Sequence, residues 1–141
     1  MCRERTLVVV KPGNEHLIPC IKDILRVHGL QVAREERVWL TVEQVGELYS
    51  NKRAWTFYTE LVAYLTSGYS YVWVVGGENA VAETLKLKGK THSPFGIRGL
   101  YGKDFIHNVF HCSDTRVEVE REMRILLEED HNGTLEDSSS G

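Results

Sequence analysis

A short segment in the C-terminal part of the chain, NVFHCSD at residues 108–114, brings together several side chains that can do chemistry. It contains His111, Cys112 and Ser113 in succession, followed by Asp114. Four roles are open for the imidazole of His111: a nucleophile, a metal ligand, one half of a Cys/His pair, or a structural residue at the end of a strand. A lone histidine at a strand end is most often structural, so the residue types alone do not establish a reactive site.

The spacing of these residues weakens two of the four roles. His107 is the nearest other histidine, but residues four apart in a strand lie more than about 10 Å from each other, too far to share a metal. Cys112 points to the face opposite His111 if the strand continues, which disfavours a Cys/His pair. A nucleophilic imidazole needs a partner that fixes its tautomer. Glu118 and Glu122 on the next predicted helix are both candidates, and the sequence does not separate them.

Two basic residues occupy positions that would suit anion binding. Lys11 closes the first apolar stretch in a Lys-Pro pair, and Arg98 lies between glycines in GIRG. Most residues of this kind are solvated surface charges. A buried strand could instead aim the Lys11 ammonium into a pocket, and the glycines would let the backbone bring the Arg98 guanidinium close to a ligand.

Composition and motifs disfavour several classes of protein. The chain has 141 residues and a formal net charge of −3, so we expect one domain and no positive field that recruits nucleic acid or acidic membranes. The three cysteines are widely spaced, and no apolar run suits a membrane span or a signal peptide. A P-loop, a GxGxxG motif and an RNA-recognition signature are all absent. We therefore expect a cytoplasmic protein with no membrane and no stable nucleic-acid partner.

The candidate residues must be positioned by strands and helices, which the apolar pattern predicts. Apolar runs and alternations predict strands, whereas apolar residues at helical spacing predict helices. The predicted strands cover residues 6–11, 30–40, 69–75 and 105–111. The predicted helices cover residues 17–28, 41–49, 55–65 and 79–88, with a last helix that Ser113 or Asp114 would cap and that ends near residue 127.

Local signals support the ends of several of these elements. Pro19 suits the first turn of a helix, where its missing N–H is not needed. Thr41 begins the sequence T-V-E-Q, a capping box. Asn79 can cap the helix that follows it, and Gly76-Gly77 before it predicts a turn.

The order of these elements predicts a fold class. Without the helix pair and the last helix it reads βαββαβ, the ferredoxin-like arrangement with an antiparallel sheet. We therefore expect an α/β (α+β) domain over residues 1–127, with an inserted helix pair and a C-terminal helix. Residues 128–141 are acidic and then serine-rich, so we expect a disordered tail. Many activities share this fold, so the fold alone does not indicate a function.

The chain resembles the nucleoside diphosphate kinases in four segments. ERTLVVVKPG, SGYSYVWVVGGENAV, GKTHSPFGIRG and NVFHCSD occur in the order of that family, and the resemblance covers about residues 4–127. Each motif alone is weak, but KP, IRG and N-x-x-H-x-S-D at consistent spacing are specific in combination. The resemblance implies transfer of the γ-phosphate of a nucleoside triphosphate to a nucleoside diphosphate, through a phosphohistidine and with ping-pong kinetics.

The resemblance also implies a role for each matched residue. His111 would be the nucleophile, Glu122 the carboxylate that orients its ring, and Ser113 a neighbour in the same network. Tyr49 would lie beside the transferred phosphate and assist Lys11. The other implied roles are phosphate contacts at Lys11, Thr91 and Arg98, ribose contacts at Asn108 and Lys11, and base stacking on Phe57. Mg²⁺ would be held mainly by the phosphates of the nucleotide, so no metal ligand of the protein is implied.

The chain departs from the family pattern at several positions. Leu85 stands in the nucleotide-binding position where the family has a phosphate-binding arginine. Lys86, Lys88 or Lys90 could compensate, although as point charges rather than bidentate donors. Cys112 replaces a small residue beside the nucleophile, where it could pack or oxidise and block the site. The loop before GIRG is shorter than usual; it helps to build trimer contacts in the family, so we expect a dimer-based homo-oligomer without predicting the hexamer.

Two hypotheses about function follow from the resemblance and its departures. The first is an active nucleoside diphosphate kinase that equilibrates pools of nucleoside di- and triphosphates. The second is a kinase-like domain with weakened catalysis that serves as a nucleotide sensor or interaction module, which Leu85, the shorter loop and the polar tail motivate. The motif N-x-x-H-x-S-D argues against an unrelated ferredoxin-like domain.

Overall fold

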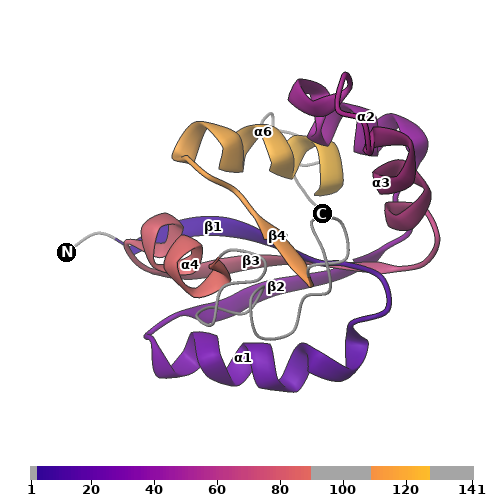
Figure 1. Ribbon diagram of the computed structural model, residues 1–141. Coiled ribbons are helices and arrows are strands. Elements are labelled where there is room, and N and C mark those ends of the chain that lie inside the picture. Colours follow the sequence, from indigo (N-terminus) through magenta and orange to yellow (C-terminus); the bar gives the residue numbers. More distant parts are fainter. Residues whose placement is uncertain (1–2, 90–108, 128–141) are drawn as a thin grey trace, which may run out of the picture.

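A computed structural model describes residues 3–89 and 109–127 of the chain (Figure 1). The elements of this part are, in chain order, β1 (Arg3–Val10), η1 (Glu15–Leu17), α1 (Ile18–Val27), β2 (Gln31–Val38), α2 (Val42–Leu48), η2 (Ser50–Lys52), α3 (Tyr58–Leu65), β3 (Ser70–Glu78), α4 (Ala80–Lys88), β4 (Phe110–Cys112) and α6 (Arg116–Leu127). Residues 90–108, which include GIRG with the loop before it and the first part of the predicted strand 105–111, lie outside the described residues, as does the predicted tail. No helix in the two described stretches is long and apolar enough to cross a membrane.

The four strands form one antiparallel sheet in the order β2-β3-β1-β4. The central strand β1 pairs with β3 on one side and with β4 on the other, so that Val8 faces both Trp73 and Cys112 in the register. With α2, η2 and α3 inserted before β3, and α6 added after β4, the order of elements is the predicted one. The expected ferredoxin-like α+β fold is therefore confirmed.

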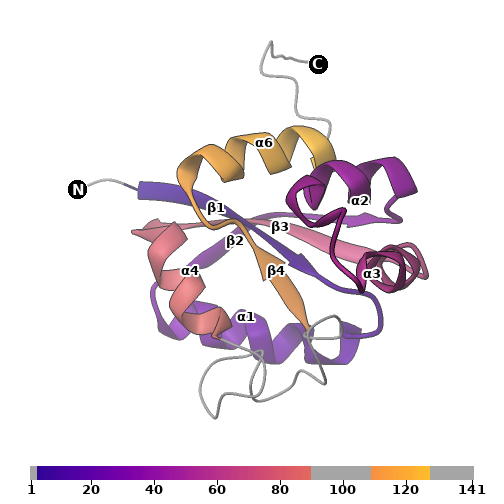
Figure 2. The same ribbon diagram turned by 45° about the horizontal axis from the view of Figure 1, so that its top comes forward.

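Helices cover both faces of the sheet and make two separate cores (Figures 1 and 2). On one face, Leu7 and Val9 of β1 pack against residues of α2, α3 and α6. On the other face, Val8 and Val10 pack with residues of α1 and the start of α4. The alternation of side chains along β1 therefore contributes to both cores at once, as expected for a strand that is buried on both faces.

Two predicted helix starts are confirmed, one by the position of a proline and one by hydrogen bonds. Pro19 lies in the first turn of α1. At α2, the Thr41 hydroxyl accepts from the Gln44 amide N–H at 3.0 Å, and the Gln44 side chain accepts from the Thr41 N–H at 2.9 Å. This reciprocal pair is the predicted capping box, and it orients the helix whose last turn reaches the site.

The prediction at the start of α4 was wrong in two respects. Gly76 and Gly77 do not form a turn but continue β3 to Glu78. A Cβ at Gly77 would come within 2.8 Å of the Gly29 carbonyl oxygen, so this strand position accommodates only glycine without a shift. Asn79 has a left-handed backbone with φ of 53° and makes no side-chain cap. The cap is supplied by a residue far away in sequence, because Glu4 Oε1 accepts from the Val81 N–H at 2.9 Å.

The cap of the last helix also differs from the prediction. Neither Ser113 nor Asp114 caps α6. The Thr115 hydroxyl accepts from the Glu118 N–H at 3.2 Å, and the Thr115 carbonyl accepts from the Val119 N–H at 3.0 Å. Ser113 is thereby left with its hydroxyl directed to a different partner, inside the site.

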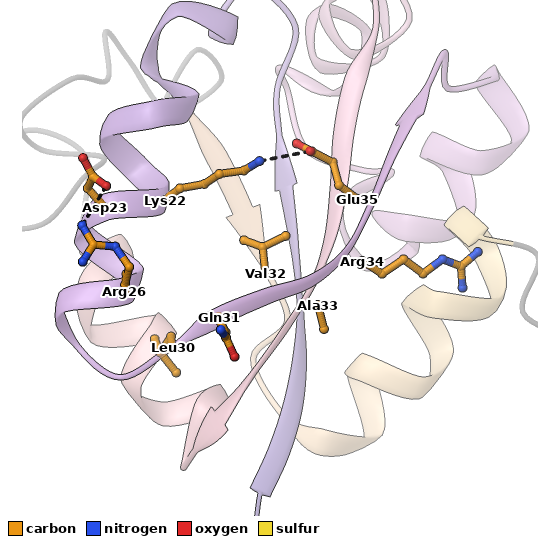
Figure 3. A pocket seen from close by; sticks show the side chains of 9 residues that line it. All are labelled: Lys22, Asp23, Arg26, Leu30, Gln31, Val32, Ala33, Arg34 and Glu35. Atoms are coloured by element: carbon orange, nitrogen blue, oxygen red, sulfur yellow. Dashed lines mark hydrogen bonds and ion pairs between the residues drawn. The ribbon is translucent and has the colours of Figure 1, made fainter.

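A pocket of about 330 Å³ lies between α1 and the edge strand β2, away from β4 (Figure 3). Lys22 of α1 and Glu35 of β2 pair across it at 3.0 Å. The other carboxylate oxygen of Glu35 accepts from the indole N–H of the buried Trp73 at 2.6 Å. This connection holds α1 to the sheet and satisfies a polar atom that burial would otherwise leave without a partner.

Candidate active site

His111 lies in the middle of β4, opposite Val9 of β1. Its neighbours Phe110 and Cys112 are fully buried in the core on the α1 side of the sheet. The side chain of His111 points the other way, and 14% of it is exposed. The prediction that Cys112 faces away from His111 is therefore confirmed, and Cys112 packs in the core rather than at the site.

Glu122 of α6 is the partner of the imidazole. His111 Nε2 lies 2.9 Å from Glu122 Oε1, and the Ser113 hydroxyl donates to the same oxygen at 2.7 Å. Glu118, the other acid that the sequence offered, pairs instead with Arg121 at 2.8 Å. Glu122, which contacts the histidine, thus lies one helical turn after Glu118, which does not pair with it.

The ionisation of Glu122 fixes the tautomer of the histidine. Burial raises the pKa of Glu122 and is the largest single influence on it. The hydrogen bonds from His111 and Ser113, with the charges of His111 and Arg121, together outweigh burial, so the pKa lies below its ordinary value. An ionised carboxylate only accepts hydrogen bonds, so Nε2 carries a proton and the lone pair of the neutral ring is on Nδ1.

Tyr49, the residue directly after α2, lies against the histidine. Its ring is buried, 5.6 Å from the ring of His111 between centroids and inclined to it by 62°. Arg121 of α6 donates to the last carbonyls of α2, at 2.8 Å to Glu47 and 3.4 Å to Leu48. The same guanidinium lies 4.0 Å from Glu122 Oε2, so one residue joins the end of α2 to the carboxylate that holds the imidazole.

These side chains border a pocket of about 570 Å³ that opens beside His111. Its basic lining residues are Lys52, Lys88 and Arg121, and its acidic ones are Asp114, Glu118 and Glu122. Glu118 and Glu122 are already hydrogen-bonded inside the protein. A nucleophilic nitrogen at the wall of a pocket with cations around it can attack an electrophile that carries negative charge, such as a phosphoryl group.

The model of the family described as "Nucleoside diphosphate kinase" matches residues 4–132. The chain belongs to the nucleoside diphosphate kinase family. A protein named nucleoside diphosphate kinase from Methanocaldococcus jannaschii is 32% identical over 134 residues, which cover 91% of this chain and 96% of the relative. The protein of that name from Archaeoglobus fulgidus is 34% identical over 133 residues, covering 90% and 88%.

Solved structures of nucleoside diphosphate kinases are similar to the described fold. The enzyme from Halobacterium salinarum in complex with CDP has a TM-score of 0.80 and 32% identity, and the match covers 93% of this chain and 95% of that chain. The apo enzyme from Encephalitozoon cuniculi has a TM-score of 0.81 and 31% identity, with 86% and 87% covered. Both the sequence and the fold therefore place the chain in the family that its motifs resemble.

The structure brings only some of the implied nucleoside diphosphate kinase residues to the pocket. His111, Glu122 and Tyr49 line it, and Ser113 lies directly behind Glu122. Phe57 is about half exposed, at 49%, at the start of α3. Its ring lies 5.5 Å from the ring of Trp55 between centroids. The implied residues Thr91, Arg98 and Asn108 lie outside the described part of the chain.

Lys11 and Leu85 are both positioned by the core. Lys11 is buried at the end of β1, and its backbone N–H donates to the carbonyl of Val109 at 2.8 Å. Val109 has φ of 80°, a strained conformation for a β-branched residue, and it directs the chain into β4 just before His111. Lys11 is not among the described side chains that line the pocket. Leu85, the position at which the resemblance implies an arginine in the family, is partly buried against both apolar cores.

Sequence reasoning missed Arg121. Its hydrogen bonds to carbonyls of α2 join residues more than seventy positions apart in the chain, whereas its pairing with Glu118 is local to α6. Its spacing of three from Glu118 on a helix was the one available signal, and such pairs are common on exposed helix surfaces. Within residues 3–89 and 109–127, no group of three or more His, Cys, Asp or Glu side chains is arranged to hold a metal ion.

Proposed function

We propose that this nucleoside diphosphate kinase carries the transferred phosphate on His111. The observation that supports this role is the pairing of His111 Nε2 with the buried, ionised carboxylate of Glu122 at the wall of a pocket. The pairing leaves Nδ1 with the lone pair. A fixed nucleophile and a charged partner behind it are what a covalent phosphoryl-transfer mechanism requires.

The proposed reaction has two half-reactions. In the first, His111 Nδ1 attacks the γ-phosphorus of a nucleoside triphosphate, a P–N bond forms, and the bond to the bridging oxygen of the β-phosphate breaks. The nucleoside diphosphate leaves with that oxygen. In the second, a terminal oxygen of another nucleoside diphosphate attacks the phosphorus, and the P–N bond breaks. Glu122 stabilises the positive charge that the ring gains in the phosphorylated state.

We propose the remaining roles from the family resemblance and the positions of the residues. Ser113 holds Glu122 Oε1, and the hydroxyl of Tyr49 acts beside the transferred phosphate together with Lys11. The exposed ring of Phe57 offers a stacking face for the base, which gives low selectivity among bases. Phosphate contacts are assigned to Lys11, Thr91 and Arg98, and ribose contacts to Lys11 and Asn108.

Mg²⁺ enters in this proposal as part of the substrate. The ion would arrive bound to the phosphates of the nucleotide and neutralise part of their charge. We also propose a homo-oligomer based on dimers, a cytoplasmic location, a kinase domain over residues 1–127 and a disordered tail over residues 128–141.

One experiment tests the covalent mechanism. The protein is incubated with γ-labelled ATP and Mg²⁺, and label that is acid-labile and alkali-stable is measured before and after GDP is added. We expect label on the wild type that moves to GDP. His111→Ala should carry none, whereas His28→Ala, which changes an exposed histidine at the end of α1, should behave as the wild type. An unlabelled wild type would contradict the covalent mechanism, and a labelled His111→Ala would contradict the choice of nucleophile.

A second candidate function is a nucleotide-binding module with weakened catalysis. Leu85 favours it, because the apolar side chain packs against the two cores and supplies no hydrogen bond to a phosphate. A charge-assisted hydrogen bond is worth roughly 1.5–3 kcal/mol, or about ten- to a hundred-fold in rate. A large gain in kcat/KM for Leu85→Arg would support the weakened module, and an unchanged kcat/KM would mean that another residue supplies the charge.

A further inference from the structure

We propose that Lys88 binds the phosphates of the nucleotide and supplies the positive charge that Leu85 does not. This inference rests on the proposed function, because it assigns a ligand to the same pocket. It also distinguishes Lys88 from Lys86, two of the three lysines that the sequence offered as substitutes for the missing arginine.

Lys88 is placed in the pocket by the packing of α4. Thr84 and Leu85 lie four and three positions before it, on the side of the helix that is packed against the protein. Lys88 follows on the same side, in the last turn, and only 15% of its side chain is exposed. It lines the pocket together with Tyr49 and His111. The aliphatic stem is therefore largely buried, and the ammonium lies near Asp114, another residue that lines the pocket shared with His111.

Lys86, the other described lysine of this segment, does not compete for this position. Lys86 has 73% of its side chain exposed and pairs at 3.3 Å with Glu83 on the outer surface of α4. It is not among the described residues that line the pocket. Lys90 lies outside the described residues. Of Lys86 and Lys88, whose positions are described, only Lys88 lines the pocket beside His111.

Among the described residues, the charge of Lys88 is weakly compensated. Within that part of the chain it pairs with Asp114 at 3.9 Å, which is longer than a hydrogen bond. Asp114 has 72% of its side chain exposed, so water screens the pair. The other two acids of the pocket are hydrogen-bonded elsewhere, Glu122 to His111 and Glu118 to Arg121. A phosphate oxygen could approach the ammonium more closely than Asp114 does and would bring more negative charge.

A lysine in this role predicts a defined pattern among variants. Lysine acts as a flexible point charge, so Lys88→Arg should retain the interaction with phosphate while Lys88→Met keeps the packed stem and removes the charge. We expect Lys88→Met to weaken binding of Mg-ATP by roughly ten- to a hundred-fold. Adenosine carries no phosphate, so its affinity should not change. Lys86→Met is the matched control on the exposed side of the same helix and should bind Mg-ATP as the wild type does.

Thermal unfolding first shows that each variant is folded. Isothermal titration calorimetry then measures the affinity of each variant for Mg-ATP and for adenosine. Lys88→Gln replaces Lys88→Met if the latter unfolds. Weaker Mg-ATP binding with unchanged adenosine binding supports the proposal. Mg-ATP binding equal to that of the wild type, or an equal loss for adenosine, overturns it.

The failure of this inference can be separated from failure of the proposed function. If the wild type takes up label from γ-labelled ATP and Lys88→Met binds Mg-ATP normally, the phosphohistidine mechanism stands and Lys88 has no part in binding phosphate. If the wild type takes up no label but the Lys88→Met variant loses affinity for Mg-ATP, Lys88 is a phosphate ligand and the covalent step is wrong.

Discussion

A single oxygen of Glu122 accepts hydrogen bonds from two residues that flank Cys112. His111 Nε2 lies 2.9 Å from it and Ser113 Oγ lies 2.7 Å from it. Residues two apart in an extended chain face the same side, so Ser113, whose N–H still pairs with the Leu7 carbonyl at 3.1 Å, lies on the same side as His111 while Cys112 faces away. The serine thus holds the carboxylate while the carboxylate holds the imidazole, and the nucleophile has one orientation.

Replacement of Glu122 should slow phosphorylation of the histidine. In Glu122→Gln an amide oxygen can still accept from Nε2, but the negative charge that stabilises the phosphorylated ring is lost. We expect the rate of phosphorylation by ATP to fall by about a hundred-fold, as measured in single-turnover experiments. Glu120→Gln, on the exposed side of α6, is the control. A rate for Glu122→Gln close to that of the control would show that Glu122 only supports the fold.

The same carboxylate predicts how stability depends on pH. The pKa of Glu122 is lower in the folded protein than its ordinary value of 4.5, so the folded state binds this proton less readily than the unfolded state does. Its contribution to stability is therefore complete above the unfolded pKa and is lost as the pH falls through the folded pKa. Between pH 7 and pH 3, the free energy of unfolding measured with urea should fall more in the wild type than in Glu122→Gln. Parallel curves for the two proteins would contradict this expectation.

At the scale of elements, Arg121 connects the two helices that supply the site. Its guanidinium donates to the carbonyls of Glu47 and Leu48 at the end of α2 and pairs with Glu118 within α6. Tyr49 directly follows those carbonyls, and Glu122 directly follows Arg121. A shift of α2 relative to α6 would therefore move the tyrosine relative to the histidine.

Loss of this connection should affect catalysis more than binding. We expect Arg121→Met to lower kcat by roughly ten-fold or more, since small misplacements of reacting groups are costly, while KM for the nucleotide changes little. Arg121→Lys should recover part of the loss, because one ammonium can still reach a carbonyl of α2. Steady-state kinetics decide the matter, with Arg124→Met as the exposed control on the same helix. If KM rises by roughly ten-fold while kcat does not change, Arg121 contacts the substrate instead.

Helix and strand patterns in the sequence predicted most of these elements, and local signals predicted those caps that are local. The capping box at Thr41 uses partners three residues apart, so it is visible in the sequence. The cap of α4 comes from Glu4, which is 77 positions from the N–H that it accepts, and no local pattern contains that information. For the same reason the sequence offered both Glu118 and Glu122, and only the packing of α6 against β1 and α2, which brings Glu122 to His111, decided between them.

At the scale of the whole molecule, one strand serves both cores. The side chains of β1 alternate between a core with α2, α3 and α6 and a core with α1 and α4. The predicted order of elements leads to this arrangement, because ferredoxin-like topology makes the first strand central. The predicted nucleotide contacts at Thr91, Arg98 and Asn108 lie outside the described residues and stay predictions.

Because Cys112 is buried, the rate at which its thiol is labelled can measure how often β4 separates from β1. The thiol is fully buried behind the nucleophile, so an oxidant or thiol reagent in the pocket cannot reach it while β4 is paired with β1. In a variant with Cys2→Ser and Cys20→Ser, the sequence leaves Cys112 as the one remaining thiol.

The labelling rate of Cys112 in this variant should equal the reagent's intrinsic rate multiplied by the fraction of molecules in which the sheet has opened. The protein is mixed with an aromatic disulfide, and the rate of labelling gives that fraction. Added denaturant should raise the fraction in parallel with global unfolding. A thiol that reacts at once in native buffer would show that β4 separates from β1 independently of global unfolding, and His111 would then lie on a strand that opens locally in the native state.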